Sequence, residues 1–287
     1  MSKQPEPRLF GVLGDPVDHS LSPAMHNAAF AALGLPHLYL RWRASPAELP
    51  VALAEARRLG VAGLNLTVPL KESVLPLLDT MTPEARRIGA VNTVVFSAGR
   101  LTGDNTDARG FGRSLRGRAR VAGARVVLIG AGGSARAVGA SLVTAACAEI
   151  IVANRTPARG QALAAWLRRL GARRVESVPL AALRDGAPLE RARAVVNTTP
   201  LGLARRAMAV RVAAAPRSCL FVDLVYGATP SPFLVTAARA GRPTLDGAAM
   251  LLHQGALAFQ SWTGRRAPLD AMAAALRKAG LALPRVC

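Results

Sequence analysis

The chain has 287 residues, enough for one large domain or two of ordinary size, and 51% of them are hydrophobic, which excludes a disordered protein. The N-terminal segment lacks the apolar run of a signal peptide, and no stretch approaches the roughly 18 uninterrupted apolar residues of a membrane span, so we expect a cytoplasmic protein. The formal net charge is +20; Lys occurs only at positions 3, 71 and 278, so 34 of the 37 basic residues are Arg. These arginines are scattered through every segment without interleaved aromatic residues, which argues against nucleic-acid binding.

Apolar strand-like runs alternate with helical patterns along the chain, which predicts α/β architecture with mostly parallel sheets. In the first hundred residues we expect helices that end at Gly34 and Gly60, and a hairpin near residue 98. The expected elements are strands over 9–14, 37–43 and 63–69, helices over 23–33 and 46–59, and hairpin strands over 91–96 and 100–102.

A second α/β series begins at residue 125 and a helical tail follows residue 246. The expected elements are strands over 126–129, 150–153, 194–197 and 220–224, and helices over 135–146, 248–263 and 270–279, with one more helix after the second strand. This order predicts two domains: an N-terminal α/β substrate domain over 1–107, to which helices over 246–287 return, and a Rossmann-type doubly wound domain over 108–245. A ligand cleft is expected between them.

The second series opens on a G-x-G-x-x-A fingerprint, Gly130-Ala131-Gly132-Gly133-Ser134-Ala135, between an apolar strand and an Ala-rich helix. Gly130 permits the tight turn, Gly132 lets the backbone approach a pyrophosphate, and Ala135 lets the helix pack close to the strand. The start of the helix then offers free N–H groups to the anion. The pattern indicates a dinucleotide site.

The end of the next strand distinguishes the two nicotinamide dinucleotides. NAD enzymes commonly carry Asp or Glu there for the ribose 2′-hydroxyl, but this chain has Asn154-Arg155-Thr156, with a further Arg159. A guanidinium binds a 2′-phosphate, which a carboxylate would repel, so NADP is favoured. The structural alternative is that Thr156 merely caps a helix starting at Pro157.

Four polar clusters remain at expected strand ends or helix starts. They are His19-Ser20-Leu-Ser22-Pro23, Asn65-Leu-Thr67-Val-Pro69-Leu-Lys71, Gly89-Ala-Val-Asn92-Thr93 and Gly103-Asp-Asn-Thr-Asp107. Structural roles are the alternative: a helix cap for Ser22, a turn for Asn92 and a helix start for Asp107. Lys71 stands out because nearly every other cation is Arg, and an ammonium, unlike a guanidinium, can give up a proton near neutral pH.

In this order, before the Gly-rich turn, the clusters resemble the shikimate dehydrogenase family. The resemblance covers about residues 9 to 262 and continues through Asn197-Thr-Thr-Pro-Leu-Gly202, Asp223-Leu-Val-Tyr226 and Asp246-Gly247-Ala-Ala-Met250-Leu-Leu-His-Gln254. One departure is Gly227-Ala228, where the family usually has Asn-Pro, so we expect the following loop to differ.

The resemblance implies NADPH-dependent reduction of 3-dehydroshikimate to shikimate, in chorismate and aromatic amino acid biosynthesis. It implies that Lys71 and Asp107 are the catalytic pair, and that Ser20 and Ser22 bind the substrate carboxylate with Tyr226 nearby. The ring hydroxyls would be bound by Thr67, Lys71, Asn92, Asp107 and Gln254. The cofactor would be bound by Gly130, Ala131, Gly132, Gly133, Ser134, Asn154, Arg155, Thr156, Arg159, Leu224 and Gly247.

Three alternatives stay open. A quinate-preferring or NAD-using relative could share the same site; a folate-type dehydrogenase has a similar two-domain build but gives no reason for the paired serines; and a basic binding protein could keep a non-catalytic dinucleotide fold. No metal is expected, because the four His and the cysteines Cys147, Cys219 and Cys287 show no ligand spacing. We expect small-molecule partners, no nucleic acid or membrane, and a monomer or homodimer.

Overall fold

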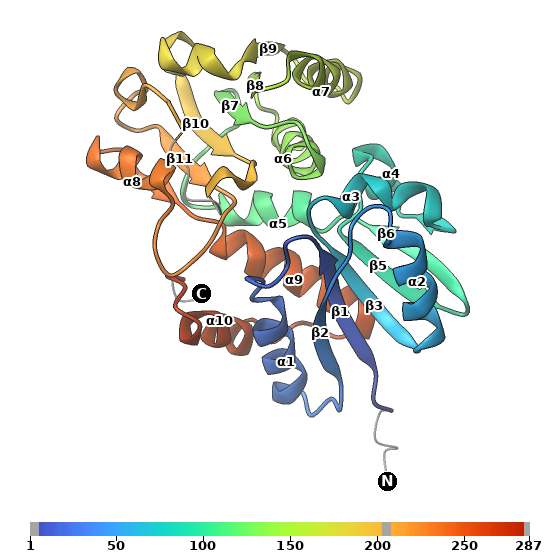
Figure 1. The fold of residues 1–287 in the computed structure, drawn as a ribbon. Helices are drawn as coiled ribbons and strands as arrows, with labels where there is room; N and C mark the ends of the chain where they lie inside the picture. Colours follow the sequence, from blue (N-terminus) through green and yellow to red (C-terminus); the bar gives the residue numbers. More distant parts are fainter. Residues whose placement is uncertain (1–5, 203–207, 284–287) are drawn as a thin grey trace. The chain divides into compact units, whose positions relative to one another are not determined.

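The computed structural model describes residues 6–202 and 208–283 and consists of two compact units, which are described separately (Figure 1). The N-terminal unit comprises Met1–Gly110 with Leu251–Cys287, and the central unit comprises Phe111–Met250. The boundaries expected from the sequence, after residues 107 and 245, differ from these limits by a few residues.

The N-terminal unit is built on a mixed six-stranded sheet of order β2-β1-β3-β5-β6-β4. Its strands are β1 (Leu9–Gly14), β2 (Leu38–Arg43), β3 (Val61–Leu66), β4 (Thr80–Met81), β5 (Thr93–Ser97) and β6 (Arg100–Asp104). The first three are parallel, whereas β5 is antiparallel to both β3 and β6, which confirms the hairpin. The expected end of β3 at residue 69 was wrong: the chain turns after Leu66, where the Leu70 N–H bonds to the Thr67 carbonyl and Pro69 has no N–H for a sheet ladder.

Six α-helices accompany this sheet in the described part of the chain. They are α1 (Ser22–Ala32), α2 (Leu49–Arg58), α3 (Leu70–Ser73), α4 (Pro83–Ile88), α9 (Ala248–Thr263) and α10 (Leu269–Lys278). Helices α1 and α2 end before Gly34 and Gly60, whose φ angles of 61° and 70° are the left-handed conformation expected after a helix end. Trp262 of α9 packs on the sheet at Gly63, where an added Cβ would lie 2.3 Å from the indole nitrogen. The C-terminal helices therefore complete the core of the N-terminal unit.

The central unit contains a parallel sheet of order β12-β11-β10-β7-β8-β9, the strand order of a doubly wound fold. Its strands are β7 (Arg125–Ile129), β8 (Glu149–Asn154), β9 (Val175–Pro179), β10 (Ala192–Asn197), β11 (Leu220–Asp223) and β12 (Thr244–Leu245). Its helices include α6 (Gly133–Thr144), α7 (Pro157–Arg169) and α8 (Pro232–Arg239), and α5 (Asp107–Ser114) enters it from the N-terminal unit.

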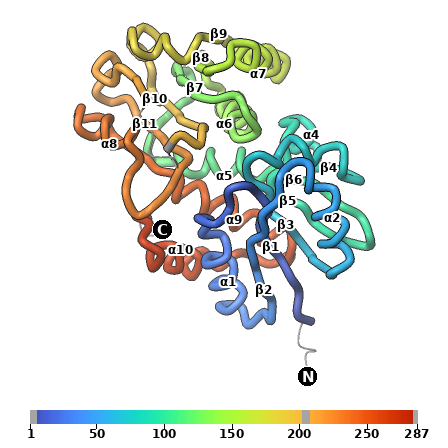
Figure 2. Tube along the Cα trace, in the orientation of Figure 1, coloured from blue at the N-terminus to red at the C-terminus, as the bar shows by residue number. Residues whose placement is uncertain are grey.

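Alternate residues of β7 face two different cores, as the two-residue period of a strand requires. Val126 and Leu128 pack in one cluster with side chains of α6 and α7, while Val127 and Ile129 pack in another with Phe233 of α8. The trace in Figure 2 shows α6 and α8 on either side of this sheet. Both faces are covered, which explains why its strands are continuous apolar runs.

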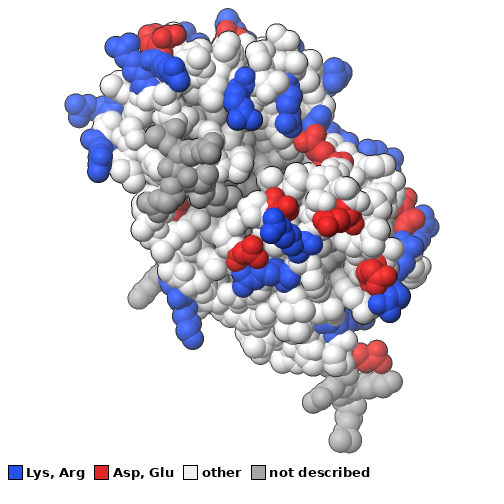
Figure 3. Space-filling view, in the orientation of Figure 1, with Lys and Arg blue, Asp and Glu red and all other residues white. Residues whose placement is uncertain are grey.

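In the part of the chain that the structure describes, no helix combines the length and apolar character needed to cross a membrane. Lys and Arg side chains are spread over the visible face in Figure 3, with Asp and Glu among them. This distribution agrees with the scattering seen in the sequence.

Candidate active site

Lys71 and Asp107 form a buried ion pair in the N-terminal unit. Lys71 lies on the short helix α3 after β3, and Asp107 is the first residue of α5. The Lys71 Nζ is 2.6 Å from Asp107 Oδ2, and the two side chains are only 12% and 6% exposed. Burial of a charge is costly unless it is paired, and here each charge has the other as its partner.

Asn92 holds the second oxygen of this carboxylate. Its Nδ2 donates to Asp107 Oδ1 at 2.8 Å and to Thr106 Oγ1 at 3.0 Å, and its Oδ1 accepts from the Thr106 N–H at 2.7 Å. Gln254 Oε1 lies 3.2 Å from the same Nδ2. Asp107 is the first residue of a helix, as the structural alternative supposed. Asn92 is more than a turn residue, because its side chain contacts Thr106, Asp107 and Gln254. Four of the expected residues thus meet at one point.

Two further residues support this group and were not among the expected site residues. Asn65 donates from Nδ2 to the Asn92 carbonyl at 3.0 Å, and its Oδ1 accepts from the Tyr39 hydroxyl at 2.8 Å. Both side chains are buried. An asparagine inside an apolar strand was a usable sequence signal for Asn65, whereas Tyr39 looks like an ordinary core aromatic residue.

Ser20, Ser22 and Thr67 lie in the same unit. The helix-cap interpretation of Ser22 was wrong: α1 begins at Ser22 itself, its N-cap is Leu21, and Ser20 Oγ accepts from the Ser22 N–H at 3.3 Å. Both serines are buried. Thr67 follows β3 beside Gly14, where an added Cβ would lie 2.2 Å from the threonine methyl group. The expected substrate residues of the N-terminal unit therefore offer hydroxyl, amide, carboxylate and ammonium groups.

In the central unit, the Gly-rich turn fits a dinucleotide pyrophosphate. Gly130 has φ of 110°, and an added Cβ would lie 2.5 Å from Thr198 Oγ1, so only glycine fits. A Cβ at Gly132, by contrast, would meet open space. Gly132 is also the N-cap of α6 and has no side chain to cap its first turn, so an anion could approach the positive end of this helix.

The segment after β8 lies close to this turn. Arg159 Nη2 is 3.4 Å from the Ala131 carbonyl, and Arg155 is exposed. Thr156 is the N-cap of α7, as the structural alternative supposed, but its side chain makes no capping hydrogen bond within the described chain. Instead, Asn154 Nδ2 donates to the Thr156 carbonyl at 2.8 Å. The Arg159 guanidinium therefore lies at the Gly-rich turn, and Arg155 is exposed on the same segment.

The loop after β11 is anchored by a buried carboxylate, Asp223. It accepts from Asn197 Nδ2 at 3.0 Å, from the Val225 N–H at 3.1 Å and from the Ser231 hydroxyl at 2.6 Å. Burial raises the pKa of the Asp223 carboxyl, and these donors oppose the rise. Ser231 is also the N-cap of α8. The segment containing Gly227 and Ala228 is thus held at both ends despite its departure from the family pattern.

Gly247 fixes the same loop from its other side. Its N–H donates to the Val225 carbonyl at 3.2 Å, and an added Cβ would lie 2.0 Å from the Leu224 carbonyl oxygen. The expected residues Leu224, Tyr226 and Gly247 therefore belong to one region of the central unit, whereas the other expected substrate residues belong to the N-terminal unit.

Replacing Ser231 with alanine is expected to lower the free energy of unfolding by about 1–3 kcal/mol, because α8 loses its cap and the buried Asp223 carboxylate loses a donor. Urea denaturation measures the change. Ser218→Ala, at an exposed serine of the same unit, is the matched control and should leave stability within about 0.5 kcal/mol of the parent. Equal effects of the two substitutions would show that the contact with Asp223 adds nothing.

Within residues 6–202 and 208–283, no three His, Cys, Asp or Glu residues gather as metal ligands. Cys147 and Cys219 are free and buried, and burial raises the pKa of their thiols to about 11 and about 12. Both are therefore protonated, unreactive thiols near neutral pH. Cys287 lies outside the described residues.

Three family models match successive parts of the chain. The shikimate dehydrogenase substrate binding domain matches residues 12–94, the shikimate / quinate 5-dehydrogenase model matches 114–226, and the shikimate 5′-dehydrogenase C-terminal domain matches 247–277.

Curated relatives match over nearly the whole length. The NADP(+) shikimate dehydrogenase of Symbiobacterium thermophilum is 44% identical over 92% of this chain and 92% of its own, and that of Moorella thermoacetica is 45% identical over 94% and 93%. The crystal structure of the Thermus thermophilus shikimate 5-dehydrogenase in complex with NADP(H) and shikimate superposes with a TM-score of 0.81 at 43% identity, covering 95% of this chain and 99% of that one.

Proposed function

Since the chain belongs to the shikimate dehydrogenase family, we propose that it catalyses the reversible NADPH-dependent reduction of 3-dehydroshikimate to shikimate, a step towards chorismate and the aromatic amino acids. The names of its curated relatives support this reaction and this cofactor. The observation that carries the proposal is the buried Lys71–Asp107 pair held by Asn92, because it sets a proton donor against a fixed carboxylate in a polar site.

Reduction of a ketone requires a hydride at carbon and a proton at oxygen. Bound NADPH supplies the hydride. We assign the proton to the Lys71 ammonium, which donates it to the developing alkoxide and is left as a neutral amine; this amine then regains the one H+ that the reduction consumes from solution. Asp107, 2.6 Å away, orients the ammonium and stabilises its charge before transfer. In the reverse direction the neutral amine accepts the hydroxyl proton.

The remaining polar groups of the N-terminal unit suit a polyhydroxylated ring acid. We assign the substrate carboxylate to Ser20 and Ser22, whose hydroxyls are donors. The ring hydroxyls are assigned to Lys71, Asp107 and three neutral partners, Thr67, Asn92 and Gln254. Tyr226 is proposed as a further contact to the carboxylate. A folate-type substrate would give the paired serines no role.

The central unit is assigned to NADP. The open space at Gly132 and the uncapped start of α6 support pyrophosphate binding there. Arg155 and Arg159 are assigned to the 2′-phosphate, since a guanidinium forms paired hydrogen bonds with phosphate oxygens. Other residues assigned to the dinucleotide are Gly130, Ala131, Gly133, Ser134, Asn154, Thr156, Leu224 and Gly247.

Arg155→Ala is expected to weaken NADP binding by about 10- to 100-fold, the effect of losing a hydrogen-bonded charge, and to leave NAD binding nearly unchanged. Titration of both dinucleotides by calorimetry measures the difference. Arg169→Ala, at an exposed arginine near the far end of α7, provides the control of equal charge and should affect neither. Equal losses for NADP and NAD would place the 2′-phosphate elsewhere.

The decisive assay follows nicotinamide absorbance with shikimate or quinate as substrate, each combined with NADP or NAD. We expect the highest kcat/KM with shikimate and NADP. Absence of turnover of shikimate with either cofactor would overturn the proposal and favour a non-catalytic binding protein. The quinate alternative is not favoured by the names of the curated relatives, and higher kcat/KM for quinate would restore it. A cytoplasmic location and a monomeric or dimeric state stay predictions.

A further inference from the structure

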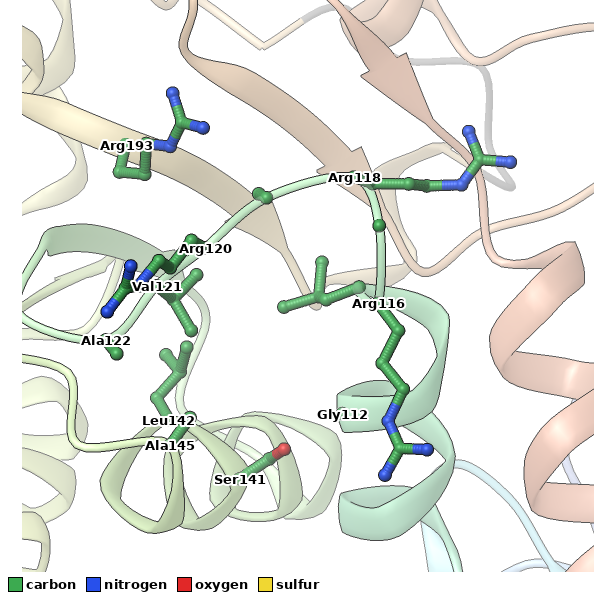
Figure 4. Close-up of a pocket in the computed structure, with 13 residues that line it drawn as sticks. Gly112, Arg116, Arg118, Arg120, Val121, Ala122, Ser141, Leu142, Ala145 and Arg193 are labelled. Carbon is green, nitrogen blue, oxygen red and sulfur yellow. The ribbon is translucent and has the colours of Figure 1, made fainter.

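A hollow of about 480 Å³ lies in the central unit, between the segment that joins α5 to β7 and the last turn of α6 (Figure 4). It is separate from the Gly-rich turn, which lies at the other end of α6. Twelve helical residues separate the two ends, a rise of about 18 Å. The volume is within the range of small-molecule sites.

The walls of this hollow are largely apolar. Leu115, Val121 and Leu142 line it and are buried, with relative exposures of 5%, 6% and 1%. Figure 4 shows Ser141 and Leu142 on the side of α6 that faces the connecting segment. Because Gly112 has no side chain, it leaves room for the Ser141 hydroxyl between α5 and α6: an added Cβ would lie 3.0 Å from Ser141 Oγ. The apolar surface that the hollow exposes to water therefore belongs to smaller side chains such as Ala122 and Ala145, with the Ser141 hydroxyl in the same wall.

Four arginines stand around these walls: Arg116, Arg118, Arg120 and Arg193. In Figure 4 their guanidinium groups lie at the margin, on different sides of the hollow. No acidic residue lines it among the described residues. The lining is thus strongly cationic as well as apolar.

Neighbouring groups offset only part of this charge. Helices α5 and α6 end nearby, and each carboxyl end carries a partial charge of roughly −0.5, which cannot balance four positive charges. Asp246 is half-buried, and burial raises the pKa of its carboxyl, while the Ala248 N–H and the charge of Arg118 oppose the rise. Arg193 makes a 3.5 Å hydrogen bond to the Ser218 carbonyl, while Arg116 and Arg120 form no ion pair within the described ranges.

We propose that this hollow binds a small organic anion: a carboxylate, sulfonate or phosphate group attached to a flat apolar body. The apolar body would lie between Ala122 and Ala145, and the anionic group would lie at the rim, attracted by Arg116 and Arg120 from its two sides. An inorganic anion would leave the walls exposed to water, and a neutral apolar molecule would leave the arginine charges unbalanced. The site is distinct from the one assigned to NADP.

The test is calorimetric titration of the full chain with naphthalene-2-sulfonate, with NADP⁺ present at saturation so that the Gly-rich turn does not bind the probe. One saturable site per chain is expected. Two variants should each raise Kd about tenfold or more: Arg116→Gln/Arg120→Gln, which removes charge, and Ala145→Phe, which fills the hollow from the end of α6. Thermal melting verifies that each variant is folded.

The matched control is Arg169→Gln/Arg173→Gln, which removes the same charge from exposed positions of the central unit and should leave Kd within about twofold. The neutral analogue 2-naphthalenemethanol should bind at least about tenfold more weakly than the sulfonate. Absence of saturable binding, equal Kd values for the pocket and control variants, or equal binding of the neutral analogue would each overturn the proposal. Shikimate turnover by the pocket variants, measured separately, tests the proposed function and not this site.

Discussion

Alanine in place of Lys71 is expected to lower kcat for shikimate oxidation by about 10²–10⁴-fold, the usual contribution of a general acid or base. The ammonium is buried against Asp107, and no other lysine lies in the described part of the N-terminal unit except Lys278 at the end of α10. The residues assigned to NADP belong to the central unit, so the Kd for NADP should stay near that of the parent. Steady-state rates and calorimetric titration measure the two quantities.

Two matched variants separate proton transfer from charge. Lys71→Arg keeps the positive charge beside Asp107 but cannot release a proton near neutral pH, so kcat should stay low. Lys278→Ala removes an exposed lysine and should leave kcat unchanged. Nearly full activity in Lys71→Arg would reassign the residue to electrostatic stabilisation, and an unchanged kcat in Lys71→Ala would remove it from the chemistry.

The second large effect concerns the buried His26. Its ring stacks on Tyr39 with centroids 4.5 Å apart, and both ring nitrogens lack a hydrogen-bond partner among the described residues. Desolvation lowers the pKa of His26 from 6.5 to about 3. The folded protein therefore keeps this ring neutral while the unfolded chain protonates it.

His26 is expected to make the protein less stable in acid. Above pH 6.5 the ring is neutral in both the folded and the unfolded state, so His26 does not change the free energy of unfolding with pH. As pH falls from 6.5 towards 3, the unfolded state gains a proton that the folded state excludes, so the free energy of unfolding falls by about 1.4 kcal/mol per pH unit. By pH 4 the loss is about 3 kcal/mol, a large part of ordinary domain stability.

His26→Phe, with His26→Leu as a second variant, removes this loss of stability in acid, because neither new side chain titrates. Urea denaturation between pH 7.5 and 4 should show parent and variant stabilities running parallel above pH 6.5 and diverging below it, with the variant relatively more stable. Carboxyl groups titrate equally in both proteins, so the difference isolates His26. A constant difference for both His26 variants across the range would contradict the prediction.

Much of the architecture could be predicted locally. The strand over 9–14 and the helix over 248–263 occur at the expected residues, because each is an apolar run bounded by turn or capping residues. Elements that were missed are short, such as the two-residue strands β4 and β12, or depend on packing, such as β9 at the sheet edge. The two-residue strands carry too few residues to show a period.

The candidate site, like the fold, could be predicted in part from local sequence. The order of the polar motifs, and the glycines required at positions 130 and 247, were sufficient to indicate the family and a dinucleotide turn, because backbone conformation and close approach restrict which residue fits locally. Residue types alone also singled out Lys71 as a titratable cation.

Only the tertiary structure decided which polar groups bond to one another. Asn92 reaches Asp107 across 15 residues and Gln254 across 162, and Tyr39 supports Asn65 from a neighbouring part of the sheet. Local sequence cannot specify such contacts, because hydrogen-bond geometry between distant segments depends on how strands and helices pack. For the same reason, the unpartnered ring of His26 and the arginine-rimmed hollow beside α6 became visible only in the folded chain.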